Sequence, residues 1–165
     1  MPISTSASRS WAVFDIDGVL ADVRHRLHHI EGPRPSWSAF FREADSDPPL
    51  APGIALAHEL AESHDLAYVT GRPAWLHDVT STWLQEQGLP SGPLRMRRNG
   101  DHRPARIVKL ELLVDLARRG TIALVVDDDP DVVATVRDAG IPVRHATWVR
   151  RTRALRRAQE DQGRT

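Results

Sequence analysis

The stretch from Val13 to Asp22 reads VFDIDGVLAD and places three carboxylates directly behind the first apolar run of the chain. Asp15 and Asp17 lie two residues apart, and Asp22 follows shortly after them. Like charges at this spacing repel one another, and a carboxylate at the end of a buried strand loses its solvation. A hard divalent cation with oxygen ligands is the natural compensation for such a cluster. The stretch therefore predicts an acidic metal site.

Other charged residues are also clustered. The chain holds 22 basic and 22 acidic residues, so its formal net charge is zero and gives no overall signal for a polyanionic partner. Acidic residues gather at 127–131 and arginines at 95–106 and 150–157, and opposed clusters can steer an anionic ligand towards a metal site. Lys109 is the only lysine, which favours a place where a compact ammonium is needed rather than a planar guanidinium. The alternative is a chance surface lysine.

The elements that must position these residues follow from the periodicity of apolar residues. Short apolar runs predict strands at 11–14, 66–69, 121–126 and 141–146, with a short extended piece at 93–97. Helical periodicity and breakers predict helices at 53–64, 74–87, 107–118 and 131–139. In the third helix, the residues expected to face inward are Ile107, Leu110, Leu113, Val114 and Ala117. The stretch 23–52 is the least regular part of the chain and is rich in proline.

Strands that alternate with amphipathic helices predict an α/β fold, with a mostly parallel sheet covered by helices on both faces. Ligands of such sheets bind at the carboxyl ends of the strands. Three of the predicted strands end in polar residues suited to a site, which are Asp15, Thr70 and Asp127. The pattern therefore predicts one site that gathers these side chains.

The length of 165 residues corresponds to one domain. We expect a flexible N-terminal arm at 1–10, a catalytic domain at 11–149 and an Arg-rich C-terminal tail at 150–165 that is helical or disordered and mainly solubilising. The absence of cysteine excludes disulfides and thiolate chemistry. The polar N-terminal residues and the lack of a long apolar run predict a soluble, cytoplasmic protein without a secretory signal or membrane contact.

Four pieces occur in order along the chain: DIDG at 15–18, TGR at 70–72, Lys109, and DD at 127–128. This combination resembles the haloacid dehalogenase (HAD) superfamily of phosphotransferases, over roughly residues 11–148. The resemblance implies a three-layer Rossmann-like HAD fold. Neither gap between the motifs has room for a large cap domain, so we expect an open site that suits a phosphate at the end of a large molecule.

The resemblance also implies a role for each motif. Asp15 would be the nucleophile that forms an aspartyl-phosphate. Asp17 would protonate the leaving oxygen and then deprotonate the attacking water. Thr70 and Lys109 would hold the phosphoryl oxygens.

A magnesium ion is the implied cofactor, and it would neutralise phosphoryl charge. Its ligands would be Asp15, the backbone carbonyl of Asp17, and Asp128. Asp127 would orient these ligands.

A closer resemblance is to the 3'-phosphatase domain of phage-type polynucleotide kinase/phosphatases. It is carried by RHRLHHI at 24–30, WSAFF at 37–41, DPPLAPG at 47–53, LRMRRNGDHRP at 94–104 and VVDDDPDVV at 125–133. The substrate-binding residues that we expect on this basis are Arg26, Gly71, Arg72, Arg97, Arg98 and Arg103. One departure is that Ala105 and Arg106 stand where relatives carry a pair of acids, and a GxxxxGK[ST] kinase motif is absent.

The sequence thus predicts a Mg²⁺-dependent phosphomonoesterase that acts on polynucleotide 3'-phosphate ends. The alternatives are a nucleotidase or other small-molecule phosphatase, and an inactive module that binds nucleic-acid ends. The expected partner is a phosphorylated substrate, without an obligate protein partner.

Three other patterns have simpler interpretations. The alternating acids at 127–131 lack the glycine and glutamate of a calcium loop, so a strand, a metal ligand and a helix start are favoured. The histidines within 25–29 are expected to be solvated or at the edge of the substrate rather than metal ligands. The aromatic residues within 37–41 have helical spacing and are expected to pack in the core rather than stack on bases.

Overall fold

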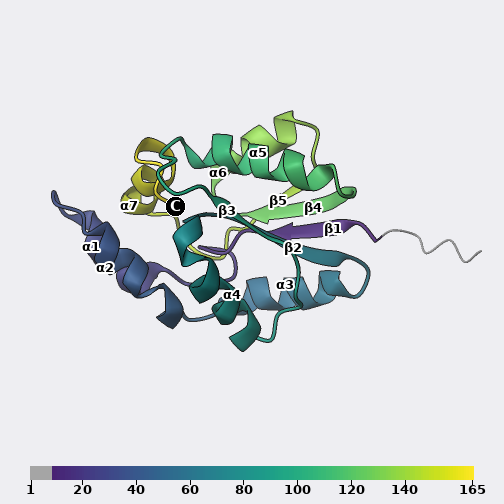
Figure 1. The fold of residues 1–165 in the computed structure, drawn as a ribbon, viewed down its shortest axis with the longest axis horizontal. Coiled ribbons are helices and arrows are strands. Elements are labelled where there is room, and N and C mark those ends of the chain that lie inside the picture. Colours follow the sequence, from purple (N-terminus) through teal and green to yellow (C-terminus); the bar gives the residue numbers. More distant parts are fainter. Residues whose placement is uncertain (1–8) are drawn as a thin grey trace, which may run out of the picture.

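The computed structural model describes residues 9–165 and shows a parallel β-sheet between two layers of helices (Figure 1). The described strands are β1 (Trp11–Phe14), β2 (Asp65–Pro73), β3 (Leu94–Arg97), β4 (Ile122–Asp127) and β5 (Val143–His145). They form one sheet in the order β3-β2-β1-β4-β5, and every neighbouring pair is parallel. The predicted α/β fold with a parallel sheet covered on both faces is confirmed.

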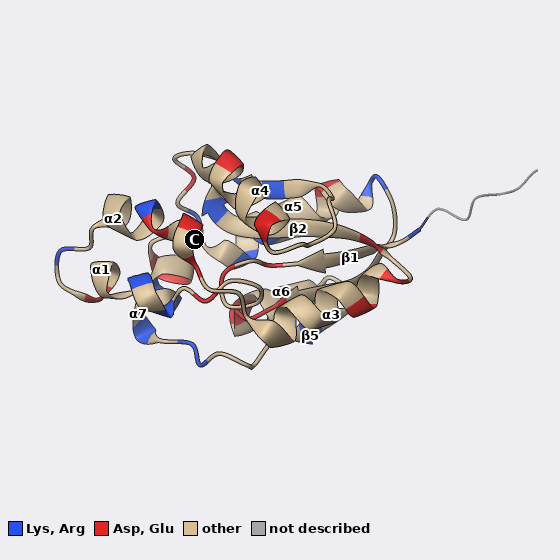
Figure 2. Ribbon diagram, turned by 90° about the horizontal axis from the view of Figure 1, so that it is seen from below, with Lys and Arg blue, Asp and Glu red and all other residues tan. Residues whose placement is uncertain are grey.

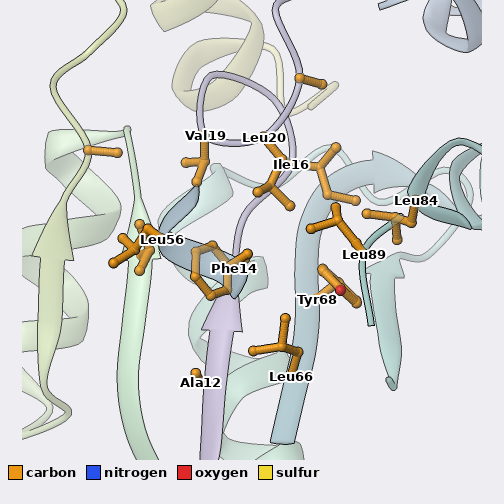
Figure 3. Close-up of a cluster of buried hydrophobic side chains, with 14 of the residues drawn as sticks. Ala12, Phe14, Ile16, Val19, Leu20, Leu56, Leu66, Tyr68, Leu84 and Leu89 are labelled. Carbon is orange, nitrogen blue, oxygen red and sulfur yellow. The ribbon is translucent and has the colours of Figure 1, made fainter. Parts of the chain in front are cut away.

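The longer helices cover the two faces in pairs (Figure 1). One face carries α3 (Ala51–Ala61) and α4 (His77–Glu86), and the other carries α5 (Ala105–Ala117) and α6 (Pro130–Asp138). Successive side chains of β1 alternate between the layers, because a strand has a period of two. Phe14 lies beside Leu56 of α3, as Figure 3 shows, and shares a buried apolar cluster with Leu84 of α4. Val13 belongs to a second cluster on the other face, with Leu113 of α5 and Val136 of α6.

The inward face predicted for α5 is wrong, apart from Leu113. Ile107 and Val114 are 38% and 46% exposed, and the buried residues are Ala105, Val108, Lys109, Leu113 and Leu116. The helix is rotated about its axis relative to the expectation, so that the ammonium of Lys109 points towards the carboxyl end of the sheet. Apolar side chains nearly surround this helix, so periodicity could not distinguish its faces.

The stretch between β1 and α3 is more regular than expected. It contains the short helices η1 (Arg24–Arg26), α1 (His28–Glu31), α2 (Trp37–Arg42) and η2 (Ala44–Ser46). Phe40 and Phe41 of α2 are buried, which confirms the predicted core packing of these rings. These helices are too small to form a large cap domain. The described residues therefore agree with the expected fold, which has no large cap.

The C-terminal residues form α7 (Arg153–Arg156), followed by the π-helical turn η4 (Arg157–Asp161). Ala154, Leu155 and Ala158 are buried and pack against Phe40 and Met96. Of the two forms expected for this tail, helical or disordered, the structure shows the helical one, and the apolar residues between the arginines dock it on the domain.

The predicted N-terminal arm at 1–10 lies outside the described residues except for Arg9 and Ser10. Arg9 donates hydrogen bonds to the carbonyls of Ala61 and His64 at the end of α3. Within the described part of the chain, no helix is long and apolar enough to cross a membrane.

Candidate active site

The carboxyl ends of the central strands bring the sequence motifs together. Phe14, at the end of β1, is in register with Tyr68 of β2 and Val126 of β4. Asp15 follows β1 directly, Thr70 lies two residues beyond Tyr68, and Asp127 ends β4. Because the three strands are parallel and aligned in register, these side chains lie at the same edge of the sheet, as the sequence predicts.

Three carboxylates surround the single lysine at this edge. Asp15, Asp127 and Asp128 each offer an oxygen, and these oxygens lie within 4.8 Å of one another. The Lys109 Nζ lies 2.9 Å from Asp15 Oδ2 and donates a 2.7 Å hydrogen bond to Asp127 Oδ2. All four side chains are buried. The lysine is thus part of the site and not a chance surface residue.

The three carboxylates of this group carry more negative charge than the single ammonium of Lys109 can balance. Burial raises the pKa of Asp15 to about 7, against the lowering effect of Lys109. Burial and the neighbouring carboxylates raise the pKa of Asp128 well above its usual range, and its Oδ1 has no hydrogen-bond partner. Burial lowers the pKa of Lys109, but Asp127 and Asp15 outweigh it and raise the value. Three carboxylates with one ammonium and an unpartnered oxygen fit a hard divalent cation.

Gly18 of the DIDG motif allows Asp128 to reach this group. Its backbone has a φ of +79°, and a Cβ built on it would lie 2.1 Å from Asp128 Oδ2. A side chain at this position would be strained and would displace the carboxylate, which explains why the motif ends in glycine.

Asp17 belongs to a separate polar network. Its Oδ1 accepts hydrogen bonds of 2.8 and 2.6 Å from Arg72 and one of 3.3 Å from Arg26. Burial raises the pKa of Asp17, but the two guanidiniums outweigh it and lower the value to about 2. Asp17 is therefore an ionised carboxylate in this arrangement.

Asp47 is a member of this network that the sequence did not reveal. Its buried carboxylate accepts hydrogen bonds from Arg26 at 2.7 and 2.9 Å and from Arg72 at 2.7 Å, and it lies 2.7 Å from His25 Nε2. Trp83 donates a hydrogen bond to its backbone carbonyl. The only sequence signal was its place in the DPPLAPG stretch, which gave it no role.

The expected substrate-binding residues differ in where they lie. Arg26 and Arg72 are buried and bound to Asp17 and Asp47, and Gly71 packs against the backbone of Thr165.

The other three arginines differ in their surroundings. Arg97 is buried and donates hydrogen bonds to the carbonyls of Gly71, Asp101 and Arg103. It therefore holds the loop between β3 and α5 in place. Arg103 pairs with Asp101 and Glu111. Arg98 is exposed.

The remaining acids and histidines have local roles. Asp22 pairs with Arg24 and lies outside the group of Asp15, Asp127 and Asp128. Asp129 caps α6 by accepting a hydrogen bond from the backbone N–H of Asp131, which agrees with a helix start and not a calcium loop. His29 lies 3.0 Å from Glu43.

The site is covered, which contradicts the expected open site. Asp15 and Asp17 are each 3% exposed. In Figure 2, acidic and basic segments lie together around the C-terminus, near α7. Thr165 donates a 2.9 Å hydrogen bond from its Oγ1 to Asp17 Oδ2.

Comparison with known families and structures places this arrangement among phosphatases. Residues 9–147 match the family described as the polynucleotide kinase PNKP phosphatase domain. No curated protein sequence matches the chain.

Solved structures share the fold. A chain in a Pnkp1/Rnl/Hen1 complex matches with a TM-score of 0.69 at 20% identity, over 85% of this chain and 46% of that one. This chain thus spans less than half of that solved chain. A haloacid dehalogenase-like hydrolase from Streptococcus pneumoniae matches with a TM-score of 0.61 at 15% identity, over 93% of this chain and 92% of that one. A HAD-type protein from Bacillus subtilis, solved with bound magnesium, matches with a TM-score of 0.58 at 11% identity, over 82% and 87%.

Proposed function

The chain belongs to the family of the polynucleotide kinase PNKP phosphatase domain, and from this premise we propose that it is a Mg²⁺-dependent phosphomonoesterase of polynucleotide 3'-phosphate ends. We assign the catalytic domain to residues 11–149. The observation that carries the proposal is the buried group of Asp15, Asp127 and Asp128 around Lys109. A nucleophile, a cation and a place for a divalent metal meet there at one edge of the sheet.

The proposed reaction has two displacements at phosphorus. A carboxylate oxygen of Asp15 attacks the phosphorus, and the bond from phosphorus to the leaving oxygen breaks. Water then attacks the aspartyl-phosphate and releases inorganic phosphate and the free carboxylate. Lys109 and the hydroxyl of Thr70 hold the phosphoryl oxygens. Asp15, the backbone carbonyl of Asp17 and Asp128 would hold a Mg²⁺ ion, which would neutralise charge on the phosphoryl group.

Asp17 donates a proton to the leaving oxygen in the first displacement and accepts one from the attacking water in the second. Its present contacts with Arg72 and Arg26 keep it ionised and weaken its hold on a proton. A phosphoryl group in the site would offer these guanidiniums new oxygen partners. Asp17 would then lose its cationic neighbours and hold a proton more readily, as donation to a leaving oxygen requires.

Asp17→Asn should impair turnover most for poor leaving groups. An alkoxide leaving group needs a proton, whereas an activated aryl leaving group departs without one. We expect a loss of about 10²- to 10⁴-fold for an oligonucleotide 3'-phosphate and a clearly smaller loss for p-nitrophenyl phosphate. Initial rates with both substrates measure the difference. An equal loss for both substrates would count against Asp17 as the acid.

A rim beside the site, formed by Pro73, Trp75 and Arg98, supports a substrate larger than a phosphate. Trp75 is 57% exposed, and its ring packs edge-on against Phe41 with centroids 5.6 Å apart. Trp75 and Arg98 line a hollow of about 90 Å³ together with Pro73, which follows the TGR motif by one residue. Bases stack on aromatic rings, and guanidiniums bind backbone phosphates. A strand whose terminal phosphate enters the site could place a neighbouring nucleoside here.

Trp75→Ala and Arg98→Ala should each weaken turnover of an oligonucleotide 3'-phosphate. A stacked base contributes about 1–3 kcal/mol, so kcat/KM for the oligonucleotide should fall about tenfold in Trp75→Ala. The effect of Arg98→Ala should shrink as salt rises, because backbone contacts release counterions. Both variants should retain hydrolysis of p-nitrophenyl phosphate, and Arg118→Ala, at the far end of α5, is the control. Equal losses for both substrates would argue against the rim as a strand-binding surface.

The enclosure of the site favours a second candidate, a nucleotidase or other small-molecule phosphatase. Asp15 is nearly inaccessible, and a small substrate needs less room than a strand. A turnover panel with Mg²⁺ separates the candidates by comparing a 3'-phosphorylated oligonucleotide, nucleoside monophosphates and sugar phosphates. A preference for the oligonucleotide supports the first proposal, and a salt-independent preference for mononucleotides supports the second. Binding of the oligonucleotide without turnover of any substrate would indicate an inactive end-binding module.

The cytoplasmic location and the lack of an obligate protein partner stay predictions. The chain from the Pnkp1/Rnl/Hen1 structure is part of a complex, but that assembly is a property of that protein.

A further inference from the structure

The C-terminal segment reaches the centre of the active site. The Thr165 hydroxyl donates a hydrogen bond to Asp17 Oδ2, and an Arg97 nitrogen lies 3.4 Å from the Thr165 carbonyl in a second hydrogen bond. A Cβ built on Gly71 of the TGR motif would lie 2.3 Å from the Thr165 carbonyl carbon. Thr165 itself is buried. The segment therefore fills the space beside both the acid–base residue and the phosphate-binding motif.

Two sets of contacts hold this segment in place. Near its start, Leu155 and Ala158 pack into the apolar cluster that contains Phe40. Farther along, Glu160 pairs with Arg106 of α5 at 2.5 Å. The backbone at Gly163 runs so close to the His102 carbonyl that a Cβ would lie 2.0 Å from its oxygen.

The final residues are held by polar contacts, unlike the start of the segment, which is held by apolar packing. Residues 163–165 contribute no side chain to the apolar clusters. Their polar contacts are the hydrogen bonds of Thr165, a 2.7 Å hydrogen bond from the Arg164 backbone N–H to the Ala158 carbonyl, and the Arg164 guanidinium, which lies 5.3 Å from the centre of the Trp37 ring. The anchor at Leu155 and Ala158 can therefore remain while the last residues move. Opening the site requires only a local displacement.

A substrate in the proposed reaction needs the same space. Its leaving oxygen must come within hydrogen-bond distance of Asp17, which Thr165 now occupies. Its phosphoryl oxygens must meet the TGR motif, which the Thr165 backbone covers at Gly71. The two occupants cannot be present together.

We propose that residues 163–165 are a built-in blocker of the active site that competes directly with the phosphorylated substrate. This inference rests on the proposed function for the identity of the competitor. The docked segment lowers the fraction of molecules that can bind substrate, so it raises the apparent KM by the inverse of that fraction. The chemical step in an opened molecule is unaffected, and kcat is unchanged.

The kinetic test uses a chain that ends after Gln162, which retains the apolar anchor, and the full-length variants Thr165→Val and Thr165→Ser. If about nine-tenths of molecules are docked, truncation should lower KM for p-nitrophenyl phosphate about tenfold at constant kcat. Thr165→Val keeps the shape but loses the hydroxyl, and should lower KM about threefold. Thr165→Ser keeps the hydroxyl and should behave like the wild type. A lower kcat or an unchanged KM after truncation would overturn the proposal.

A second measurement does not depend on turnover. Hydrogen–deuterium exchange of residues 159–165, read by mass spectrometry, should be faster in Thr165→Val than in Thr165→Ser without any ligand. It should also rise in the wild type when inorganic phosphate and Mg²⁺ are added, because the anion displaces the segment. Unchanged exchange in both comparisons overturns the blocker even in an active enzyme. If no phosphomonoester is hydrolysed while exchange still responds, the proposed function fails and the blocker stands.

Discussion

Asp15→Asn should abolish phosphatase turnover while leaving the chain folded. The amide has the shape of the carboxylate but is a poor nucleophile, so kcat should fall by roughly 10⁴-fold or more. The variant retains an oxygen that can face Lys109, whose Nζ lies 2.9 Å from Asp15 in the wild type. Rates with p-nitrophenyl phosphate in the presence of Mg²⁺ measure the loss, and circular dichroism checks the fold. Hydrolysis at the wild-type rate would remove Asp15 from the nucleophile role.

The same variant should change how stability depends on pH in metal-free buffer. Burial raises the pKa of Asp15 to about 7 in the folded chain, above the ordinary value of 3.8. A carboxyl group with a raised folded-state pKa stabilises the fold fully below its unfolded pKa, and this contribution is lost as pH rises through about 7. The Tm of the wild type should therefore fall more steeply than that of Asp15→Asn between about pH 4 and 7, the interval between these two pKa values. Parallel Tm profiles would contradict the assigned environment of Asp15.

Asp128→Ala should remove the response to Mg²⁺, whereas Asp127→Ala should weaken activity without removing it. Asp128 Oδ1 has no hydrogen-bond partner, which suits a direct metal ligand. Asp127 instead accepts hydrogen bonds from Lys109 and from the backbone N–H of Asp129, so it orients its neighbours. We expect a loss of about 10³-fold or more for Asp128→Ala and about 10- to 100-fold for Asp127→Ala.

Thermal melts separate metal binding from catalysis. A ligand that binds only the folded state at a hundred times its Kd stabilises it by about 2.7 kcal/mol. Mg²⁺ should therefore raise the Tm of the wild type and of Asp127→Ala, but leave that of Asp128→Ala unchanged. A Mg²⁺ shift retained in Asp128→Ala and lost in Asp127→Ala would reverse the assignment of the two residues.

Much of the fold and part of the site follow from local signals in the sequence. The apolar run before Asp15 and the one before Asp127 predict strands, and parallel strands align their carboxyl ends at one edge. This rule by itself places Asp15, Thr70 and Asp127 together, as the structure does. The solitary Lys109 could also be assigned to the site, since the chain uses arginine at every other basic position.

Other features were decided by tertiary structure. The face of α5 that is buried depends on the contact of Lys109 with Asp15. A helix that is apolar on most sides has no periodic pattern that would reveal which face this is. The buried network of Asp47 with Arg26 and Arg72 joins residues from separate loops, and a sequence does not state which buried charges will pair.

The covering of the site depends on a hydrogen bond between residues 148 positions apart. The C-terminal segment has only a few small or apolar side chains among its arginines, so by composition it resembles a solvated tail. Those side chains are buried because the short helices before α3 provide an apolar surface for them, which includes Phe40. Because Leu155 and Ala158 pack there, the residues that follow lie at the site, where Thr165 donates a hydrogen bond to Asp17. Local sequence patterns thus determined the catalytic edge, whereas its accessibility depends on packing between distant segments that no local pattern encodes.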